Sequence, residues 1–426
     1  MGQEKNETKP VEGIDTTAKR RGLPGDKALG VIVLIFFVMS MVVVSSAIMK
    51  EGFSDGIVRE MIQKHIVTLF LSAIIMLVCY LMPATLMRWG TRVAYIVAWI
   101  LTLIPYFQSA GNGDAHRWID LGFIQFQPSE LLKITTIMLL AARLSARHHS
   151  IKRLRLLPST FDVRKWKTPQ QKSIFREDIL PIVLPIAMTC MVILPDATSS
   201  AVHIFIVSLA MLFLAGVRFW EICKLFFVSV VLGLVVLFMV GRFDTVVERV
   251  KDFVGTEKVE PREQLKKDTY RSCMAINNGG FFGVGAGRSV MRGRLTHPES
   301  DYIFAVVVEE FGLILSFVIV LLYLWIFFRS LRIFERCEWL YGGLLSVGLA
   351  LLVTSQGFLH VGVAIGVLPE TGQNLPFLTQ GRTGMFCAAI ALGLILSISR
   401  QVDQGTLRPP KLNIGPNDKI RNWLWK

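Results

Sequence analysis

The residues with the greatest capacity for chemistry lie in the run HPESDYIFAVVVEEFG at positions 297–312. Asp301 stands where this run turns apolar, and Glu309 and Glu310 follow about 12 Å deeper if the run is helical. A carboxyl group at the edge of an apolar phase can have its pKa raised by partial desolvation, which a general base requires. We therefore predict that Asp301 is the catalytic residue, with capping of a helix N-terminus as the alternative. Glu309 and Glu310 are better suited to buried hydrogen bonding with neighbouring helices.

Three arginines, Arg288, Arg292 and Arg294, follow the glycine-rich run NNGGFFGVGAG at 277–287. Glycines let a backbone turn tightly or approach a ligand closely. Guanidinium groups beside such a backbone suit a phosphate or pyrophosphate, so we predict that these arginines bind one. A solvated loop face is the alternative. A dinucleotide-binding loop is excluded because no predicted strand precedes the glycines.

Glu130 and Lys133 are three residues apart at the start of another apolar run. At helical spacing they share a face and neutralise one another at the edge of the hydrocarbon. We favour a structural ion pair that anchors the helix over a direct role in chemistry.

The elements that must position these residues are membrane-spanning helices. Of the 426 residues, 52% are apolar and 18% are charged, and the mean hydropathy is +0.51. A soluble domain carries about a quarter charged residues. Several apolar runs reach the roughly 17 to 25 residues that cross the hydrocarbon as a helix. The net charge of +14 reports orientation rather than nucleic-acid binding, and the six cysteines have no metal-ligating spacing.

The apolar runs predict an all-α polytopic membrane protein of about ten transmembrane helices. Lys and Arg accumulate in cytoplasmic loops, and their distribution places both termini in the cytoplasm. The runs lie at about 29–50, 66–86, 93–110, 130–146, 179–195, 201–217, 221–241, 303–328, 339–367 and 384–400.

The predicted organisation is a membrane domain between two cytoplasmic tails. The tails are residues 1–28 and 401–426, and the ten-helix membrane domain is 29–400. A basic cytoplasmic loop follows the fourth helix at 147–178, and one long extracytoplasmic loop joins helices 7 and 8 at 242–302. In this topology most of the unusual polar clusters face outward, which favours a single outward-facing site.

A series of short motifs then carries a resemblance to a known family. The motifs are GDK at 25–27, RWI at 117–119, QPSELLK at 127–133, PD at 195–196, FLAG at 213–216, GGFFGVG at 279–285, PESD through EEFG at 298–312, LPETG at 368–372 and LPF at 375–377. In this order they resemble the SEDS family of FtsW/RodA-type proteins, over about residues 25–400.

The resemblance implies a peptidoglycan glycosyltransferase that polymerises lipid II into glycan strands on the outer face of the bacterial cytoplasmic (inner) membrane. The family's essential aspartate falls on Asp301, and its Glu and Lys pair falls on Glu130 and Lys133. A class B penicillin-binding protein, a transpeptidase, is the implied partner, alongside lipid II and membrane lipids. The polar N-terminal extension and basic C-terminal tail favour the cell-division branch, with other division proteins as partners and the septum as location.

A divalent cation, Mg²⁺ or Mn²⁺, is also implied by the resemblance, and no organic cofactor is expected. Asp301 and Glu299 are the predicted ligands, because hard cations prefer carboxylate oxygens.

The chain departs from the family where Ser-x-Gly-Gly-Ser-Ser is usual, because residues 379–384 read TQGRTG. His360 and Arg271 likewise stand where Asn and Gln are common. We predict that Thr379, Arg382 and the more distant Arg117 contact the substrate together with the three arginines named above.

Two other classes of protein fit the same helices. A flippase or transporter of lipid-linked cell-wall precursor needs charged residues along a path through the whole membrane, whereas here they gather on the outward side. A noncatalytic scaffold for division proteins is the second alternative, and it requires Asp301 to be dispensable.

Overall fold

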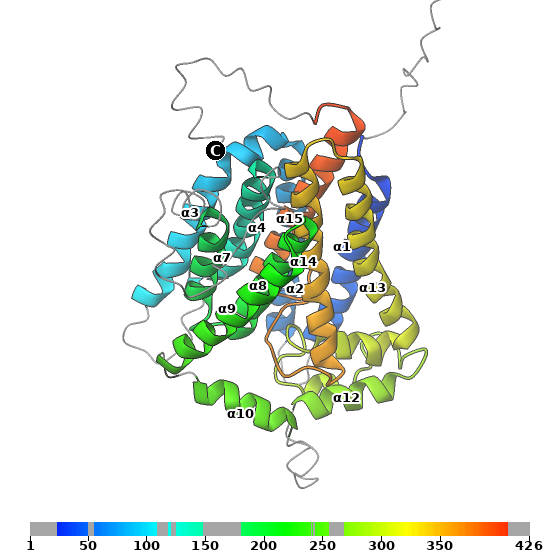
Figure 1. Ribbon diagram of the computed structural model, residues 1–426. Coiled ribbons are helices and arrows are strands. Elements are labelled where there is room, and N and C mark those ends of the chain that lie inside the picture. The colour runs from blue at the N-terminus through cyan, green and yellow to red at the C-terminus, as the bar shows by residue number, and fades with distance from the viewer. Residues whose placement is uncertain are drawn as a thin grey trace, which may run out of the picture.

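The fold is a bundle of apolar helices (Figure 1). The computed structural model describes residues 24–49, 55–108, 118–120, 125–147, 180–239, 241, 243–254 and 268–407. Within these residues the bundle is built from α1 (Lys27–Ile48), α2 (Asp55–Leu81), α3 (Ala84–Gln108), α4 (Pro128–Ala146), α7 (Leu180–Ile193), α8 (Thr198–Leu214), α9 (Phe219–Met239), α13 (Ile303–Arg336), α14 (Leu340–Ala364) and α15 (Arg382–Asp403).

Every predicted apolar run falls on one of these helices, so the all-α polytopic membrane architecture is confirmed. Among the described residues, seven helices are long and apolar enough to cross a membrane: α1, α2, α3, α9, α13, α14 and α15. Helices α7 and α8 are apolar but shorter, and α4 carries the charged residues Glu130, Lys133 and Arg143.

Helices α2 and α3 begin well before the apolar runs that predicted them. They start at Asp55 and Ala84 instead of about 66 and 93. The exposed first turns of α2 are supported by an ion pair between Glu60 and Lys64, four residues apart. Hydropathy reports where side chains meet hydrocarbon, whereas the helical backbone continues beyond that boundary.

The first and last described residues lie together at one end of the bundle, here called the terminal end (Figure 1). The Gly25 N–H donates to Asp403 Oδ2 at 3.1 Å. The Asp26 carboxylate caps α1, accepting the Ala28 N–H at 2.9 Å, and it pairs with Arg329 of α13 at 2.6 Å. The shared location of these residues agrees with an even number of crossings, and the assignment of this end to the cytoplasm stays a prediction.

The opposite end, here called the loop end, carries short elements that cover the bundle. They include α10 (Phe243–Val254), α12 (Asp268–Gly279), the 3₁₀ helix η4 (Met291–Gly293) and the segment 366–381, with α10 and α12 running across the bundle in Figure 1. The strands β1 (Ile119–Asp120) and β2 (Gln125–Phe126) pair antiparallel, with Ile119 opposite Phe126. Within the described residues, the predicted loop 242–302 therefore contains the three helical elements α10, α12 and η4.

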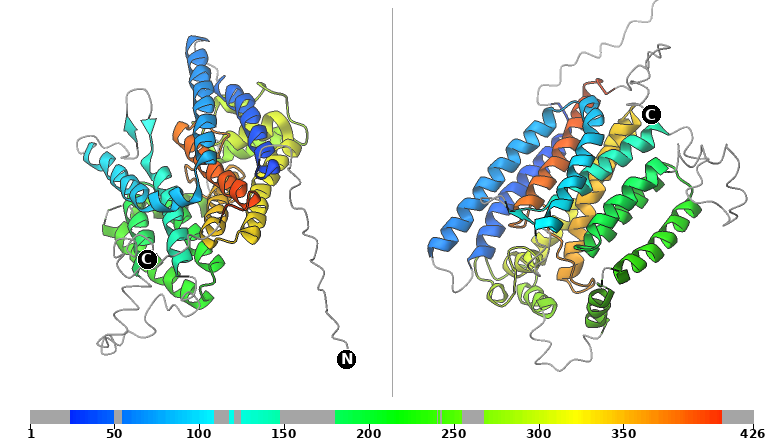
Figure 2. Two further views of the ribbon diagram at one scale, coloured as in Figure 1. Left: turned by 90° about the horizontal axis from the view of Figure 1, so that it is seen from above. Right: turned by 90° about the vertical axis from the view of Figure 1, so that its left-hand side faces the viewer.

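The core of the bundle lies around α14 and α15, with other helices packed side by side about them (Figure 2). In each of these two helices 72% of the most apolar segment is buried, against 17% in α9, so α9 is the more peripheral helix. Small residues permit the closest crossings. A Cβ atom on Gly393 of α15 would lie only 2.7 Å from the Met76 carbonyl oxygen of α2, so this crossing requires glycine.

Candidate active site at the loop end

Asp301 lies in the turn that leads into α13. The Asp301 N–H donates to the His297 carbonyl at 3.0 Å, and the helix itself begins at Ile303. The N-cap residue is Tyr302, and no side chain in the described residues caps this N-terminus. Asp301 therefore does not cap α13, which was the alternative to a catalytic role. Its half-buried carboxylate accepts no hydrogen bond from the first turn of this helix.

Charged neighbours surround this carboxylate. Burial raises the pKa of Asp301, and the negative charges of Glu299 and Glu370 raise it further. His297 and a hydrogen bond from Ser300 act in the opposite direction. The result is a carboxyl group whose pKa lies above its ordinary value, which is the direction that favours a general base.

Glu370 joins this site from the segment between α14 and α15. Its Oε1 accepts hydrogen bonds from Tyr302 Oη at 2.7 Å and from Thr269 Oγ1 at 3.0 Å. In addition, the Gln380 N–H donates to the Glu299 carbonyl at 3.1 Å. The site thus combines the turn before α13, the start of α12 and the segment 366–381. Sequence reasoning did not select Glu370, although it lies in the LPETG motif.

The three predicted phosphate-binding arginines have different surroundings. Arg292 is 9% exposed; its guanidinium donates to Ser46 O at 2.7 Å and to Gly287 O at 3.3 Å, and lies 3.5 Å from Glu310 Oε1. Such contacts within the protein favour a structural role for Arg292 over the predicted contact with phosphate. Arg288 and Arg294 are exposed, so binding of a pyrophosphate by these two stays a prediction.

Glu309 and Glu310 are fully buried and bind the segment that carries these arginines. Glu309 accepts hydrogen bonds from the Ser289 hydroxyl, from the Val290 N–H at 3.2 Å and from Asn278 Nδ2 at 3.3 Å. Glu310 accepts one from Ser46 Oγ of α1 at 2.5 Å. The preference for buried hydrogen bonding is thus supported for both, with α1, α12 and the loop before η4 as donors.

The glycine-rich run supplies backbone hydrogen-bond partners where α13 is interrupted. Gly312 has φ +82° and interrupts the helix. There, Val284 and Gly285 donate their N–H groups to the Glu309 and Glu310 carbonyls, both at 2.9 Å, and the Leu313 N–H donates to Gly280 O at 2.9 Å. A Cβ atom on Gly312 would lie 2.3 Å from the Phe281 carbonyl oxygen. The glycines therefore allow the loop backbone to approach a broken helix.

Glu130 and Lys133 form the predicted ion pair. Lys133 Nζ lies 2.8 Å from Glu130 Oε1, and the lysine side chain is 0% exposed. The contact has the geometry of an ion pair rather than of a well-directed hydrogen bond. Glu130 also lines a small cavity with Gln356 of α14 and Cys387 of α15, so the pair lies at the centre of the bundle.

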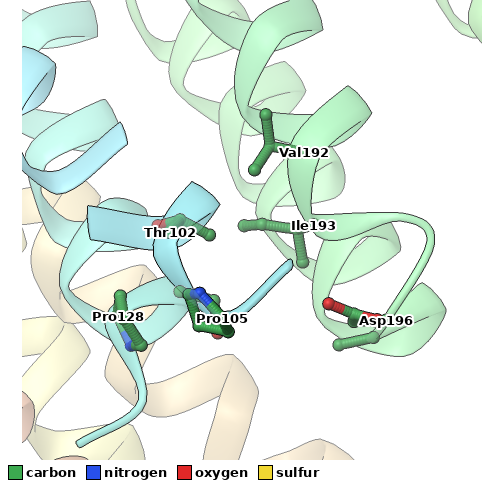
Figure 3. A pocket seen from close by; sticks show the side chains of 8 residues that line it. Thr102, Pro105, Pro128, Val192, Ile193 and Asp196 are labelled. Atoms are coloured by element: carbon green, nitrogen blue, oxygen red, sulfur yellow. The ribbon is translucent and has the colours of Figure 1, made fainter. Parts of the chain in front are cut away.

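A second small cavity lies where α3, α4 and α7 meet at the loop end (Figure 3). Thr102 and Pro105 of α3 face Ile193 of α7 across it, and Pro128 of α4 forms another wall. Asp196 is its charged residue and is 8% exposed. The walls are mostly apolar, so this cavity has fewer groups for chemistry than the surroundings of Asp301.

The remaining predicted substrate contacts differ in how far the structure describes them. Thr379 is buried and its hydroxyl donates to Leu375 O at 3.2 Å, which engages its only proton. Arg382 is half-buried at the start of α15. Arg117 lies outside the described residues. A substrate contact stays a prediction for each of these three.

A metal ion in a protein is usually held by several converging side chains. Within the described residues, no three His, Cys, Asp or Glu side chains converge closely enough to hold a metal ion. Asp301 and Glu299 therefore do not form a complete metal site together with other such side chains of this part of the chain.

The fold and the site together define a polytopic membrane protein with a half-buried carboxylate at one end of its bundle. The chain belongs to the cell cycle protein family of FtsW, RodA and SpoVE, whose model matches residues 27–404.

Relatives agree with this family, and a solved structure shares the fold. A probable peptidoglycan glycosyltransferase FtsW of Coxiella burnetii is 30% identical over 80% of this chain and 86% of its own length. Its counterpart in Neisseria gonorrhoeae is 32% identical, over 73% and 70%. A chain from a peptidoglycan synthase complex that coordinates polymerization and crosslinking superimposes with a TM-score of 0.66 at 18% identity, covering 88% of this chain and 98% of that one. This last similarity concerns the fold alone.

Proposed function

We propose that this protein is a peptidoglycan glycosyltransferase that polymerises lipid II into glycan strands on the outer face of the cytoplasmic membrane. Family membership and the names of the FtsW relatives support the activity. The observation that supports a particular catalytic residue is the half-buried Asp301 carboxylate at the loop end, whose pKa is raised by burial.

The reaction is a displacement at an anomeric carbon. The C4 hydroxyl of the acceptor's terminal sugar forms a new bond to C1 of the donor sugar, the bond from C1 to the lipid pyrophosphate breaks, and the pyrophosphate leaves with the bonding electrons. Asp301 accepts the hydroxyl proton, which requires the acceptor oxygen within about 3 Å of the carboxylate. Arg288 and Arg294 are exposed on the same end and are suited to stabilise the charge on the leaving pyrophosphate.

The proposed partner is a class B penicillin-binding protein, because a transpeptidase crosslinks the glycan strands that a glycan polymerase makes. The structural similarity to a chain from a synthase complex is compatible with such a partnership. Since the relatives cited are FtsW proteins, we place the chain with other division proteins at the septum of the bacterial inner membrane.

We also propose that polymerisation requires a divalent cation, Mg²⁺ or Mn²⁺. No step above is assigned to it, because the described residues do not form a metal site of their own. Polymerisation by protein treated with a chelator, with and without added Mg²⁺ or Mn²⁺, tests the requirement.

The deciding experiment compares two isosteric substitutions of acids in the loop-end region. Asp301→Asn is expected to lower polymerisation of labelled lipid II by about 10² to 10⁴-fold, the usual contribution of general-base catalysis. Asp244→Asn on α10, where the acid is exposed, removes the same charge and should leave the rate within twofold. Both variants should be purified with the penicillin-binding partner and should retain the wild-type melting temperature.

Substantial glycan synthesis by well-folded Asp301→Asn protein would reject the catalytic assignment. A scaffold role would then gain support if the variant still recruited division proteins. A flippase role would instead require movement of a labelled lipid-linked precursor across proteoliposomes, measured with the same two variants.

A further inference from the structure

Four arginines converge at the terminal end of the bundle, far from the site of Asp301. Arg88 and Arg92 are on α3, Arg143 is in the last turn of α4, and Arg147 directly follows it. Arg92 acts electrostatically on Arg88 and on Arg143, and Arg147 acts on Arg143 as well. We call these four residues the arginine cluster. The summed positive charge of these guanidinium groups would stabilise an anion beside them.

Two members of the arginine cluster have surroundings that suit a ligand. The Arg88 guanidinium lies 5.4 Å from the ring centroid of Trp339 and 5.8 Å from that of Tyr341, so cation–π contacts fix its orientation. The Arg143 Nε is buried, and within the described part of the chain it has no hydrogen-bond partner. A buried N–H group without a partner is costly, and a ligand oxygen would relieve this cost.

The surroundings of the arginine cluster favour a position at the level of the lipid headgroups. Trp89 lies between Arg88 and Arg92 in sequence and is 60% exposed. Tryptophan gathers at the membrane–water interface, where its ring is apolar and its N–H meets water. From Trp89 an exposed apolar stripe continues along α3 through Val93, Ile96 and Ile100. Residues at this spacing share one helix face, so the stripe leads from the arginine cluster into the hydrocarbon.

We propose that the arginine cluster binds the phosphate of an anionic membrane phospholipid whose acyl chains lie along the exposed stripe of α3. Guanidinium groups match phosphate oxygens in charge and in geometry. Basic pockets between helices at a membrane surface are suited to anionic headgroups. Free phosphate offers the same oxyanion but has nothing to cover the apolar stripe. The proposed lipid site is independent of the glycosyltransferase site.

The test uses the full-length protein in a neutral detergent. It is titrated with phosphatidylglycerol, with phosphatidylcholine of the same acyl chains, and with inorganic phosphate at constant ionic strength, and binding is followed by native mass spectrometry or thermal stabilisation. Phosphatidylglycerol is expected to bind at least about fivefold more tightly than phosphatidylcholine, from one or more arginine contacts. Inorganic phosphate should not displace it.

Substitutions locate the binding at the arginine cluster. Arg143→Gln and Arg92→Gln should each weaken phosphatidylglycerol binding about fivefold. The matched control is Arg332→Gln. Arg332 is an exposed arginine at the terminal end of α13, and its substitution changes the net charge by the same amount. It should alter binding by less than about twofold.

Three results would overturn the proposal. They are equal affinity for the two lipids, displacement of the lipid by inorganic phosphate, and an equal loss of binding in Arg332→Gln. The second result would identify a site for a free anion, and the third would mean that only the overall charge of the terminal end matters. If Arg143→Gln fails to fold, Arg92→Gln on the other helix decides by the same criteria.

Discussion

Two groups of carboxylates on neighbouring parts of the chain have opposite surroundings. Asp301 lies in the turn before α13, is half-buried and is close to the acids Glu299 and Glu370. Glu309 and Glu310 are one to two turns inside the same helix, are at most 1% exposed and accept hydrogen bonds from three other segments. Carboxylates that accept hydrogen bonds from several segments hold a structure together, whereas burial and nearby like charges raise the pKa of a carboxyl group and favour its taking a proton.

The same contrast separates the arginines of this end. Arg292 is buried among Ser46, Gly287 and Glu310, and it joins α1 to η4 and α13. Arg288 and Arg294, only a few residues away, are exposed. Similar residue types in one short segment thus divide between stabilising the loop end and facing a ligand.

The largest expected effect tests the structural half of this contrast. Glu310→Ala leaves the Arg292 guanidinium buried without its counter-charge and should lower the free energy of unfolding by about 3 to 5 kcal/mol. The double change Arg292→Met with Glu310→Leu should recover much of this loss. Asp301→Asn should change it by less than about 0.5 kcal/mol. Thermal unfolding in detergent measures all three, and equal losses for Glu310→Ala and Asp301→Asn would remove the distinction.

The Glu130 and Lys133 pair is a second buried structural pair and should behave in the same way. Glu130→Ala leaves the fully buried Lys133 ammonium group without its counter-charge and should lower the free energy of unfolding by about 3 kcal/mol. The double alanine variant should lower it by less than this single change. Folded yield and melting temperature report the difference. A harmless Lys133→Ala, combined with equal damage from Glu130→Ala and the double change, would show that Glu130 acts alone.

Substrate affinity sharpens the contrast among the arginines. Arg288→Gln and Arg294→Gln should each weaken lipid II binding by about 10- to 150-fold, because a hydrogen bond to a charged group contributes about 1.5 to 3 kcal/mol. Arg292→Gln should mainly reduce stability instead. Binding of labelled lipid II alongside thermal unfolding separates the two effects, and unchanged affinity in both exposed variants would assign these residues to the solvated loop surface.

The smallest effect is a shift in the pH profile. Asp301 acts as a base only when ionised, so its raised pKa places the acidic limb of the polymerisation rate at higher pH than an ordinary aspartate would. Glu370→Gln removes a like charge that raises this pKa and should move the limb to lower pH. His297→Asn removes a charge that lowers it and should move the limb to higher pH. Shifts in the same direction would contradict the assignment.

Stability responds to this pKa with its own sign. A carboxyl group with a raised pKa in the folded state favours folding while it is protonated, and this contribution is lost as pH rises through the folded-state pKa. Acidification should therefore reduce activity through Asp301 without destabilising the fold through Asp301. Measurements of melting temperature across the pH range of the rate profile test the separation.

The sequence itself determined the order of the helices and the ion pair between Glu130 and Lys133. Apolar length predicts a span wherever the chain must satisfy its own backbone in lipid, so the predicted runs all fall on helices. The Glu130 and Lys133 pair follows from a spacing of three on one helix, which needs no tertiary information. Asp301 was selected for its place at the start of an apolar run, and the raised pKa agrees with that choice.

Only the tertiary structure decided which charged groups meet across distant segments. Ser46 and Arg292 are far apart in sequence, as are Tyr302 and Glu370, and no local period relates either pair. The glycine run could be assigned to close backbone approach, but its partner, the break at Gly312 of α13, appears only in three dimensions. Spacing along one helix predicts neighbours on that helix, whereas contacts between helices depend on how their buried faces pack, and a single sequence does not specify that packing by pattern alone.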